Sequence, residues 1–207
     1  IKCIQVIPIQ SIGKIYCING SNKNELNNNM YVYDIYSNVW TPLPNSSIVR
    51  TNAQCCYYNN SIYVYGGYYK HQYISSIERY DMLTRSWKLI SNEIINAPTI
   101  PYDDELYVIG IRNDIHSLGL IVRTFNLLTY TWNTITTLPT SRIQHQVLSY
   151  EQYILVIGGT SDIHQRHLIE HIDMYNIETD TWNILTNIPT TRLNTSICIL
   201  DNKLYII

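Results

Sequence analysis

The sequence has little charge, almost no alanine and a single phenylalanine. Charged residues make up 14% of the 207 positions and the formal net charge is −2, so no basic excess indicates binding to nucleic acid or to an anionic membrane. Alanine occurs twice, whereas isoleucine occurs 34 times, asparagine 21 times and tyrosine 19 times. Isoleucine and tyrosine favour strands and asparagine favours turns, so this composition is typical of an all-β chain.

Paired cysteine motifs and long apolar runs are also missing. The five cysteines show no C-x-x-C spacing, and we interpret them as free thiols in a reducing, cytoplasmic compartment. No apolar run reaches the ~18–20 residues that a membrane-spanning helix needs. The sequence contains no nucleophile elbow, P-loop or zinc-protease motif. We therefore predict no catalytic residues, no cofactor and no metal.

A repeated pattern is the main signal in the sequence. The four tryptophans follow one another at spacings of 47, 45 and 50 residues. Seven residues before each tryptophan lies another aromatic residue, which is followed by Asp or Asn, and further upstream a strand-like segment ends in glycine. The repeated positions are Gly20, Gly66, Gly67, Gly110, Gly158, Gly159, Tyr33, Tyr80, Phe125, Tyr175, Trp40, Trp87, Trp132 and Trp182. We predict that the two aromatics of each copy pack as a buried cross-strand pair.

Each copy of the pattern predicts four short strands separated by turn residues. The second copy shows this best, with strands at 53–58, 61–65, 77–81 and 86–90. A single four-stranded sheet leaves its faces exposed, and radial stacking of several sheets covers them. We therefore predict one all-β domain, an incomplete β-propeller of about four to four and a half blades. The expected blades are 1–45, 46–92, 93–138, 139–187 and a partial one at 188–207.

Two parts of the chain depart from the pattern. The third copy has no glycine pair after Ile109, and Pro98 and Pro101 fall within its first strand. Proline cannot donate a ladder hydrogen bond, so we expect a weak or displaced innermost strand there. Residues 1–14 are expected to supply only a poor first strand. Because the repeats begin and end incompletely, we expect a piece of a longer protein or a natural truncation.

The segments 61–67 and 77–81, together with Trp182 and 189–192, resemble the kelch repeat, and the resemblance covers the whole chain. The bias toward Ile, Asn and Tyr is similar to that of the poxvirus kelch-BTB proteins. This resemblance implies a protein-interaction propeller that selects a host protein substrate, while a preceding BTB domain engages a cullin-RING ubiquitin ligase. Within the wider family it leaves two alternatives, an actin-binding cytoskeletal scaffold and a copper-radical oxidase domain.

The loops between the second and third strands of each copy vary in length, and we expect them on the same face as the connections between copies. Variable polar loops on a rigid scaffold commonly bind partners, and Tyr and Arg are favoured anchors. The alternative is that they are solvated loops without a function. The predicted partner-binding residues in these loops are Tyr68, Tyr69, Lys70, His71, Tyr73, Arg112, Asp114, His116, His164, Arg166 and His167.

An arginine lies at the start of the innermost strand in three copies, at Arg50, Arg142 and Arg192. Near the mouth of a central channel, a partial ring of guanidinium groups could grip an acidic peptide. The alternative is that each arginine caps local carbonyl groups between blades. His164, His167 and His171 have helix-like spacings, but we expect them in a loop that runs into a strand. Their rings would not converge there, so they predict no metal site.

Overall fold

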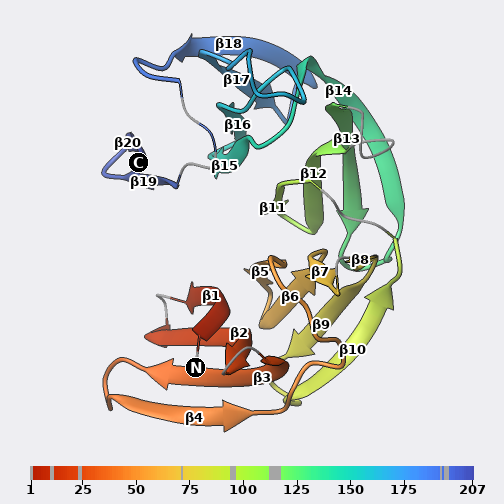
Figure 1. The fold of residues 1–207 in the computed structure, drawn as a ribbon, viewed down its shortest axis with the longest axis vertical. Coiled ribbons are helices and arrows are strands. Elements are labelled where there is room, and N and C mark those ends of the chain that lie inside the picture. Colours follow the sequence, from red (N-terminus) through yellow and green to blue (C-terminus); the bar gives the residue numbers. More distant parts are fainter. Residues whose placement is uncertain are drawn as a thin grey trace. The chain divides into compact units, whose positions relative to one another are not determined.

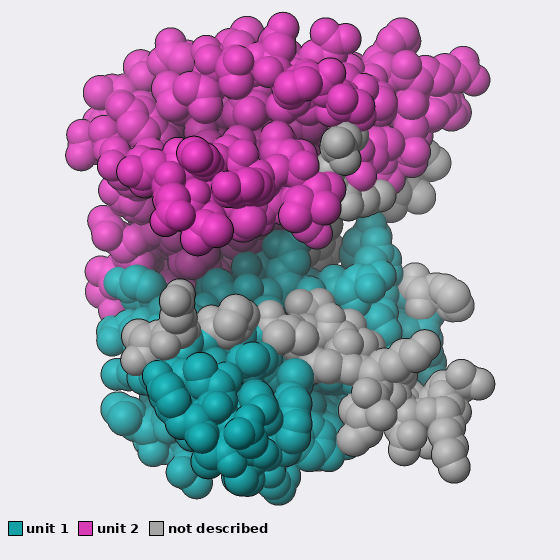
Figure 2. All heavy atoms as spheres, turned by 90° about the vertical axis from the view of Figure 1, so that its left-hand side faces the viewer, with its two compact units in different colours: residues 1–96 teal, residues 97–207 magenta. Residues whose placement is uncertain are grey.

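A computed structural model describes residues 2–9, 12–22, 25–70, 72–93, 97–111, 118–191, 193 and 196–207, with the side chains of 2–6, 8, 21, 22 and 25 left aside. The described residues form strands, turns and irregular connections, which confirms the predicted all-β class (Figure 1). They include no helix that is long and apolar enough to cross a membrane. The chain divides into two compact units, residues 1–96 and 97–207 (Figure 2).

The first sheet of residues 1–96 is antiparallel, with the strand order β1-β2-β3-β4. Its strands are β1 (Lys2–Ile9), β2 (Lys14–Asn22), β3 (Glu25–Asp34) and β4 (Val39–Leu43). Strand β1 pairs with β2 along its whole length, from Lys2 opposite Ser21 to Ile9 opposite Lys14. The expectation of a poor first strand is therefore wrong, because alternate apolar residues such as Ile7 and Ile9 are buried against the second sheet's strands.

The second sheet has the order β10-β9-β6-β5 and matches the strands predicted for the second copy to within a residue or two. Its strands are β5 (Gln54–Tyr58), β6 (Ser61–Tyr65), β9 (Ile77–Asp81) and β10 (Ser86–Ser91). Asn59 and Asn60 form the tight β5–β6 turn with φ of 42° and 53°, which asparagine tolerates better than most residues. Strand β6 is buried along its whole length. A small additional hairpin, β7 (Tyr68–Tyr69) and β8 (Gln72–Tyr73), lies between β6 and β9.

Residues 97–207 contain two further four-stranded antiparallel sheets and a terminal pair of strands. The third sheet comprises β11 (Thr99–Tyr102), β12 (Glu105–Ile111), β13 (Gly119–Asn126) and β14 (Trp132–Arg142) in that order. The fourth comprises β15 (Gln146–Tyr150), β16 (Tyr153–Ile157), β17 (His171–Asn176) and β18 (Thr181–Asn187). The final hairpin is β19 (Ile197–Leu200) and β20 (Lys203–Ile206), the first two strands of a further copy.

The proline-containing strand of the third sheet is present but short. Strand β11 pairs with β12 in register, with Pro101 opposite Leu106. β11 is the edge strand of its sheet, so one side of its backbone needs no ladder partner and proline is tolerated there. Outside the strand, the Pro98 carbonyl still accepts a hydrogen bond of 2.9 Å from the Ile109 amide.

The repeated aromatic residues pair across strands c and d, the third and fourth strands of each sheet, as predicted. Their ring centroids are 4.9, 5.2, 5.0 and 4.9 Å apart in the four sheets. Burial is unequal, because tryptophan lies on the outer strand: Tyr80, Phe125 and Tyr175 are buried, whereas Trp87 is half-buried and Trp40 is 54% exposed. The expected burial of both rings is thus correct for one ring in the second, third and fourth sheets and for neither ring in the first, where Tyr33 is half-buried.

The Asp or Asn that follows each strand c aromatic shapes the c–d turn. In the second sheet, Asp81 Oδ1 accepts the Leu83 and Thr84 amides, each at 3.0 Å. These backbone hydrogen bonds, with that of Thr84 contributing most, lower the pKa of Asp81. The other three sheets repeat this turn with Asp34, Asn126 and Asn176 as the acceptors. A short side chain that accepts hydrogen bonds from two amides explains why this position is always Asp or Asn.

Candidate functional site

The connection that precedes the second sheet and its b–c loop, the loop between its second and third strands, lie side by side. The Thr51 and Tyr68 amides each donate to the other residue's carbonyl at 2.8 Å, and Thr51 Oγ1 also donates to the Tyr68 carbonyl at 3.2 Å. This approach requires glycine at position 67, where φ is +86° and a Cβ atom would lie 2.5 Å from the Thr51 carbonyl oxygen. The glycine pair therefore holds the two loops together on one face.

The fourth sheet repeats this arrangement. The Ile143 and Thr160 amides donate to each other's carbonyls at 3.0 Å, and a Cβ atom at Gly159 would lie 2.6 Å from the Ile143 carbonyl oxygen. Both sheets thus place the b–c loop against the preceding connection, as the sequence predicts. In each of these two blades the loops form one surface that the sheet supports from below.

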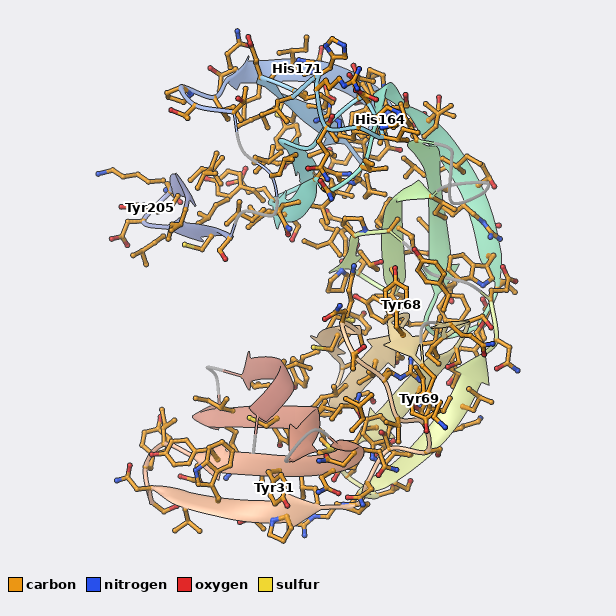
Figure 3. All side chains as sticks on the ribbon, in the orientation of Figure 1. Tyr31, Tyr68, Tyr69, His164, His171 and Tyr205 are labelled. Atoms are coloured by element: carbon orange, nitrogen blue, oxygen red, sulfur yellow. The ribbon has the colours of Figure 1, made fainter. Side chains whose placement is uncertain are left out.

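In residues 1–96 this surface includes the β7–β8 hairpin, whose two strands pair with each other. The Tyr68 and Tyr73 rings pack across it in a tilted arrangement, with centroids 4.3 Å apart, and the Ile74 amide donates to the Gly67 carbonyl at 2.9 Å. Tyr69 and Tyr73 are each 37% exposed, and the Lys70 Nζ lies 5.2 Å from the centroid of the Tyr69 ring. Tyr68 and Tyr69 lie on neighbouring parts of this loop (Figure 3). The hairpin presents aromatic side chains in a fixed backbone, which limits the entropy lost on binding.

A cavity opens beside the hairpin. It has a volume of about 530 Å³ and is lined by Leu26, Thr51, Asn52, Tyr68 and Lys70. Leu26 lies at the start of β3 in the first sheet, and the other four residues come from the two joined loops of the second. The lining mixes one apolar side chain, hydroxyl and amide groups, and one cation, which is a composition suited to orienting a polar ligand.

The b–c loop of the fourth sheet is held by its own polar contacts. Asp162 Oδ1 accepts the His164 amide at 2.9 Å and Oδ2 accepts the Arg166 amide at 3.3 Å, and the first of these lowers the pKa of Asp162 most. Thr160 Oγ1 donates to the His167 carbonyl at 2.9 Å. The side chains of His164, Arg166 and His167 are exposed on this loop, so they are available to a partner.

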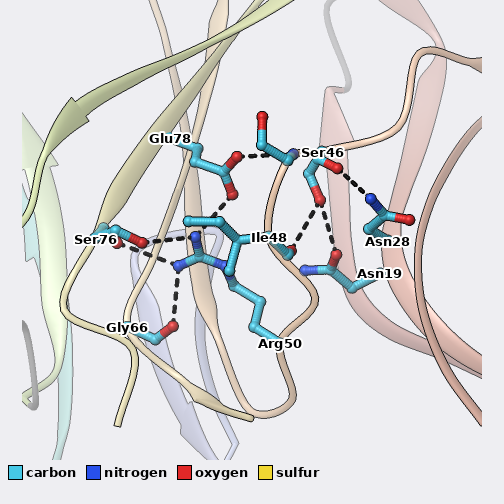
Figure 4. A network of polar contacts seen from close by, with 9 residues as sticks. Asn19, Asn28, Ser46, Ile48, Arg50, Gly66, Ser76 and Glu78 are labelled. Atoms are coloured by element: carbon cyan, nitrogen blue, oxygen red, sulfur yellow. Dashed lines mark hydrogen bonds and ion pairs between the residues drawn. The ribbon is translucent and has the colours of Figure 1, made fainter.

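Arg50 lies inside the second blade. Its side chain is 0% exposed, and Nη2 donates to Glu78 Oε2 at 2.7 Å, while Nη1 donates to the Gly66 and Ser76 carbonyls at 3.1 and 3.2 Å (Figure 4). Burial lowers the pKa of Arg50, and the Glu78 carboxylate opposes that change. An enclosed and paired guanidinium cannot reach a partner, so we assign Arg50 a structural role. The predicted ring of partner-binding arginines is therefore wrong for Arg50. The alternative, capping of local carbonyl groups, describes its contacts.

Glu78 also connects the second blade to the crossover that precedes it. Its second carboxylate oxygen, Oε1, accepts the Ser47 amide at 2.9 Å. The neighbouring Ser46 hydroxyl donates to Asn19 Oδ1 at 3.1 Å, and the Asn28 side-chain amide donates to the Ser46 carbonyl (Figure 4). Residues from two sheets therefore meet in one buried polar network, which the sequence did not predict.

Arg142 has the same place in the fourth blade. It is 0% exposed, pairs with the buried Asp173 through Nη2 and donates to the Gly158 carbonyl at 3.2 Å. Burial is the main cause that lowers the pKa of Arg142. The other oxygen, Asp173 Oδ1, accepts no hydrogen bond within the described residues and lies 3.4 Å from His171 Nε2. Arg142 is therefore also a structural residue and lies outside the candidate surface.

His145, a residue that sequence reasoning did not select, lies buried between the third and fourth sheets. Its Nε2 is 3.1 Å from the Ile109 carbonyl oxygen, and the ring fills the space above Gly110, where a Cβ atom would lie 2.7 Å from His145 Cε1. Burial, with a smaller effect from the Arg142 charge, lowers the pKa of His145 to about 4. His145 occupies the repeat position of Ala53, three residues after the arginine, and this substitution was the available signal.

Five of the predicted partner-binding residues lie outside the described residues: His71, Arg112, Asp114, His116 and Arg192. Among the residues that the structure describes, no group of three or more His, Cys, Asp or Glu side chains could hold a metal ion.

Comparison with known proteins agrees with this architecture. The family description "KLHDC2/KLHL20/DRC7 Kelch-repeats domain" matches residues 6–207. Similar proteins include a kelch repeat and BTB domain-containing protein 2 of Horsepox virus, the kelch repeat protein M-T9 of Myxoma virus and a putative F-box/kelch-repeat protein of Arabidopsis thaliana. Their identities to this chain are 23%, 26% and 28%.

These alignments cover 69%, 62% and 49% of this chain but only 30%, 26% and 28% of the respective relatives. The chain thus spans less than a third of the length of these relatives. The four four-stranded sheets, the paired aromatics at the c–d hairpins and a family match that covers nearly every residue lead to one conclusion. The chain belongs to the kelch-repeat family and is homologous to the kelch proteins of poxviruses.

Proposed function

We propose that this chain is a protein-interaction module that recognises a host protein through its b–c loops and the connections beside them. The β7–β8 hairpin carries the proposal, because two half-exposed tyrosines are held on a pre-formed backbone. Tyrosine supplies large contact area at a low cost in side-chain entropy. In residues 97–207, the exposed His164, Arg166 and His167 form a separate candidate contact surface on the fourth blade.

The larger role that we propose is substrate recognition for a cullin-RING ubiquitin ligase in the host-cell cytoplasm. Support comes from the homologous Horsepox virus protein, whose name includes a BTB domain beside its kelch repeats. The kelch repeats occupy residues 6–207 of this chain, so the ligase contact would come from a BTB domain outside this sequence. The propeller part would then contribute the choice of substrate.

The interaction is tested by capture from a host-cell lysate with the immobilised 207-residue chain, followed by mass spectrometry. The variant Tyr69→Ala/Tyr73→Ala should lose the partner, since removing a tyrosine anchor commonly costs about 2 kcal/mol, roughly 30-fold in affinity. The matched control, Tyr36→Ala/Leu83→Ala, removes apolar side chains that are 79% and 80% exposed on the c–d turns. Equal capture by both variants would reject the proposed surface.

The ligase role is tested separately in cells that express the chain fused to a BTB domain. The captured partner should fall in abundance, and blocking cullin activation should restore it. A partner that binds the chain but keeps its abundance in this assay would remove the ligase role and leave the interaction role standing.

A further inference from the structure

The cavity beside the β7–β8 hairpin has an uneven charge. Of the described residues that line it, Lys70 is the one that carries a charge at neutral pH. Within the described part of the chain, no carboxylate forms an ion pair with Lys70. Its ammonium group makes a cation–π contact with the Tyr69 ring. An ammonium group that is positioned but not neutralised attracts an anion from outside the protein.

The rest of the lining supplies hydrogen bonds and one apolar contact. Asn52 is exposed, with φ of 50°, and its side-chain amide makes no hydrogen bond within the described residues. The Thr51 hydroxyl donates to the Tyr68 carbonyl at 3.2 Å, which leaves its oxygen free to accept. Leu26 is 37% exposed at the other side of the cavity. A ligand that fits would combine an anion, a peptide-like polar group and an apolar side chain.

We propose that this cavity binds an extended peptide segment of the partner in which an Asp or Glu side chain lies next to an apolar one. The carboxylate contacts Lys70, the peptide groups meet Asn52 and Thr51, and the apolar side chain packs on Leu26. This proposal rests on the proposed function and names the chemistry that the surface selects.

A carboxylate fits this site better than a phosphate group. Phosphate recognition in peptides commonly uses clusters of arginine, whose planar fork pairs with two oxygens at once. Arg50, which precedes Thr51 in the sequence, is fully buried and paired with Glu78. A single lysine acts as a point charge, which suits the one negative charge of Asp or Glu. The volume of about 530 Å³ is within the range of about 300–1,000 Å³ for ligand pockets.

The test begins with a display library of random eight-residue peptides selected on the 207-residue chain. The best peptide and its counterpart with Glu→Gln or Asp→Asn are then measured by fluorescence polarisation. We expect a selected motif with an acidic residue beside an apolar one, and a loss of about tenfold in affinity for the neutral counterpart, the size of one charge-assisted contact. Peptides without an acidic residue, or equal affinities for both forms, would overturn the proposal, and a requirement for phosphate on the peptide would do so as well.

Four variants locate the contact. Lys70→Gln should weaken the acidic peptide about tenfold and remove the salt dependence of its affinity, whereas Lys70→Arg should keep binding within about threefold, since it retains the charge. Lys70→Glu should select basic in place of acidic residues from the same library. Lys88→Gln removes an equal charge on the exposed face of β10 and should change nothing.

An unchanged affinity in Lys70→Gln, or an equal loss in Lys88→Gln, would reject the cavity as the site. If the partner is still captured through Tyr69 and Tyr73 while all Lys70 variants bind like the original chain, only this inference fails. Loss of capture in the tyrosine variant together with the Lys70 effects supports both proposals.

Discussion

Acidification should destabilise residues 97–207 through His145, because this side chain is 2% exposed and is neutral in the folded chain. As a neutral ring, His145 can donate from Nε2 to the Ile109 carbonyl oxygen at 3.1 Å, while Nδ1 has no partner within the described residues. Protonation would put a second N–H group and a positive charge into this buried position, near the Arg142 guanidinium. Within the described residues, the new N–H group has no acceptor.

The size of the effect follows from linkage between protonation and folding. The pKa of His145 falls from an ordinary value of 6.5 to about 4 in the folded chain. The unfolded chain therefore takes up the proton first as the pH falls, so the stabilisation is complete above pH 6.5 and is lost progressively toward pH 4. At 1.36 kcal/mol for each pKa unit, the full loss is about 3 kcal/mol, and about 2 kcal/mol of it falls between pH 7.5 and 5.

The assay is urea unfolding at several pH values between 7.5 and 5, with tryptophan fluorescence as the signal that monitors unfolding. The matched variant is His145→Gln, whose side-chain amide can still donate to the Ile109 carbonyl but does not titrate. The original chain should lose about 2 kcal/mol more than the variant across this interval, whatever the stability of each at pH 7.5. A parallel decline in both chains, or an NMR titration that places the His145 pKa at 6 or above, would refute the reasoning.

Two further substitutions test how the loops and the blade interior are held. Gly67→Ala should destabilise the chain by at least about 2 kcal/mol in urea unfolding, because φ is +86° and the new Cβ atom would lie 2.5 Å from the Thr51 carbonyl oxygen; a change below 0.5 kcal/mol would contradict this close approach. Arg142→Met should cost about 3–5 kcal/mol, because it leaves a buried carboxylate without its partner, and replacing that carboxylate by an apolar residue as well should recover much of the loss.

Much of the fold could be predicted because the repeat fixes strand positions along the chain. The strands of the second sheet, its Asn59-Asn60 turn and the pairing of Tyr80 with Trp87 all follow from local patterns with a period of two and from turn chemistry. Exposure of the outer ring did not follow, because spacing shows which residues face each other across a hairpin but not which of them lies nearer the solvent. Strand β1 was underestimated for a similar reason, since the alternation of Ile7 and Ile9 does not show by itself that β2 pairs along the whole strand.

The candidate site was predicted less well, because side-chain direction at a loop depends on contacts between distant residues. The place of Arg50 and Arg142 at the start of the innermost strands suggested a position near the mouth of a central channel. The contrary signal was an acidic residue near the start of strand c, Glu78 or Asp173, directly after a buried isoleucine. An acid on a buried strand needs a cation. The tyrosine loop was proposed as a site because it is a polar, variable loop that carries aromatic residues, but its contact with the preceding connection depends on Thr51 and Gly67.

The buried carboxylates also limit how this protein can evolve. In the second blade the carboxylate of Glu78 reaches the Ser47 amide, whereas the residue at the same distance before Arg142 is Pro139, which has no amide hydrogen to give. The shorter Asp173 stands where no such donor exists. The length of the buried acid therefore matches the residue three positions before the arginine, in the connection that precedes the blade. A blade copied to another place without that connection would carry the acid but not the matching residue. Recombination between these repeats should accordingly succeed only when the exchanged segment includes both the blade and the connection that precedes it.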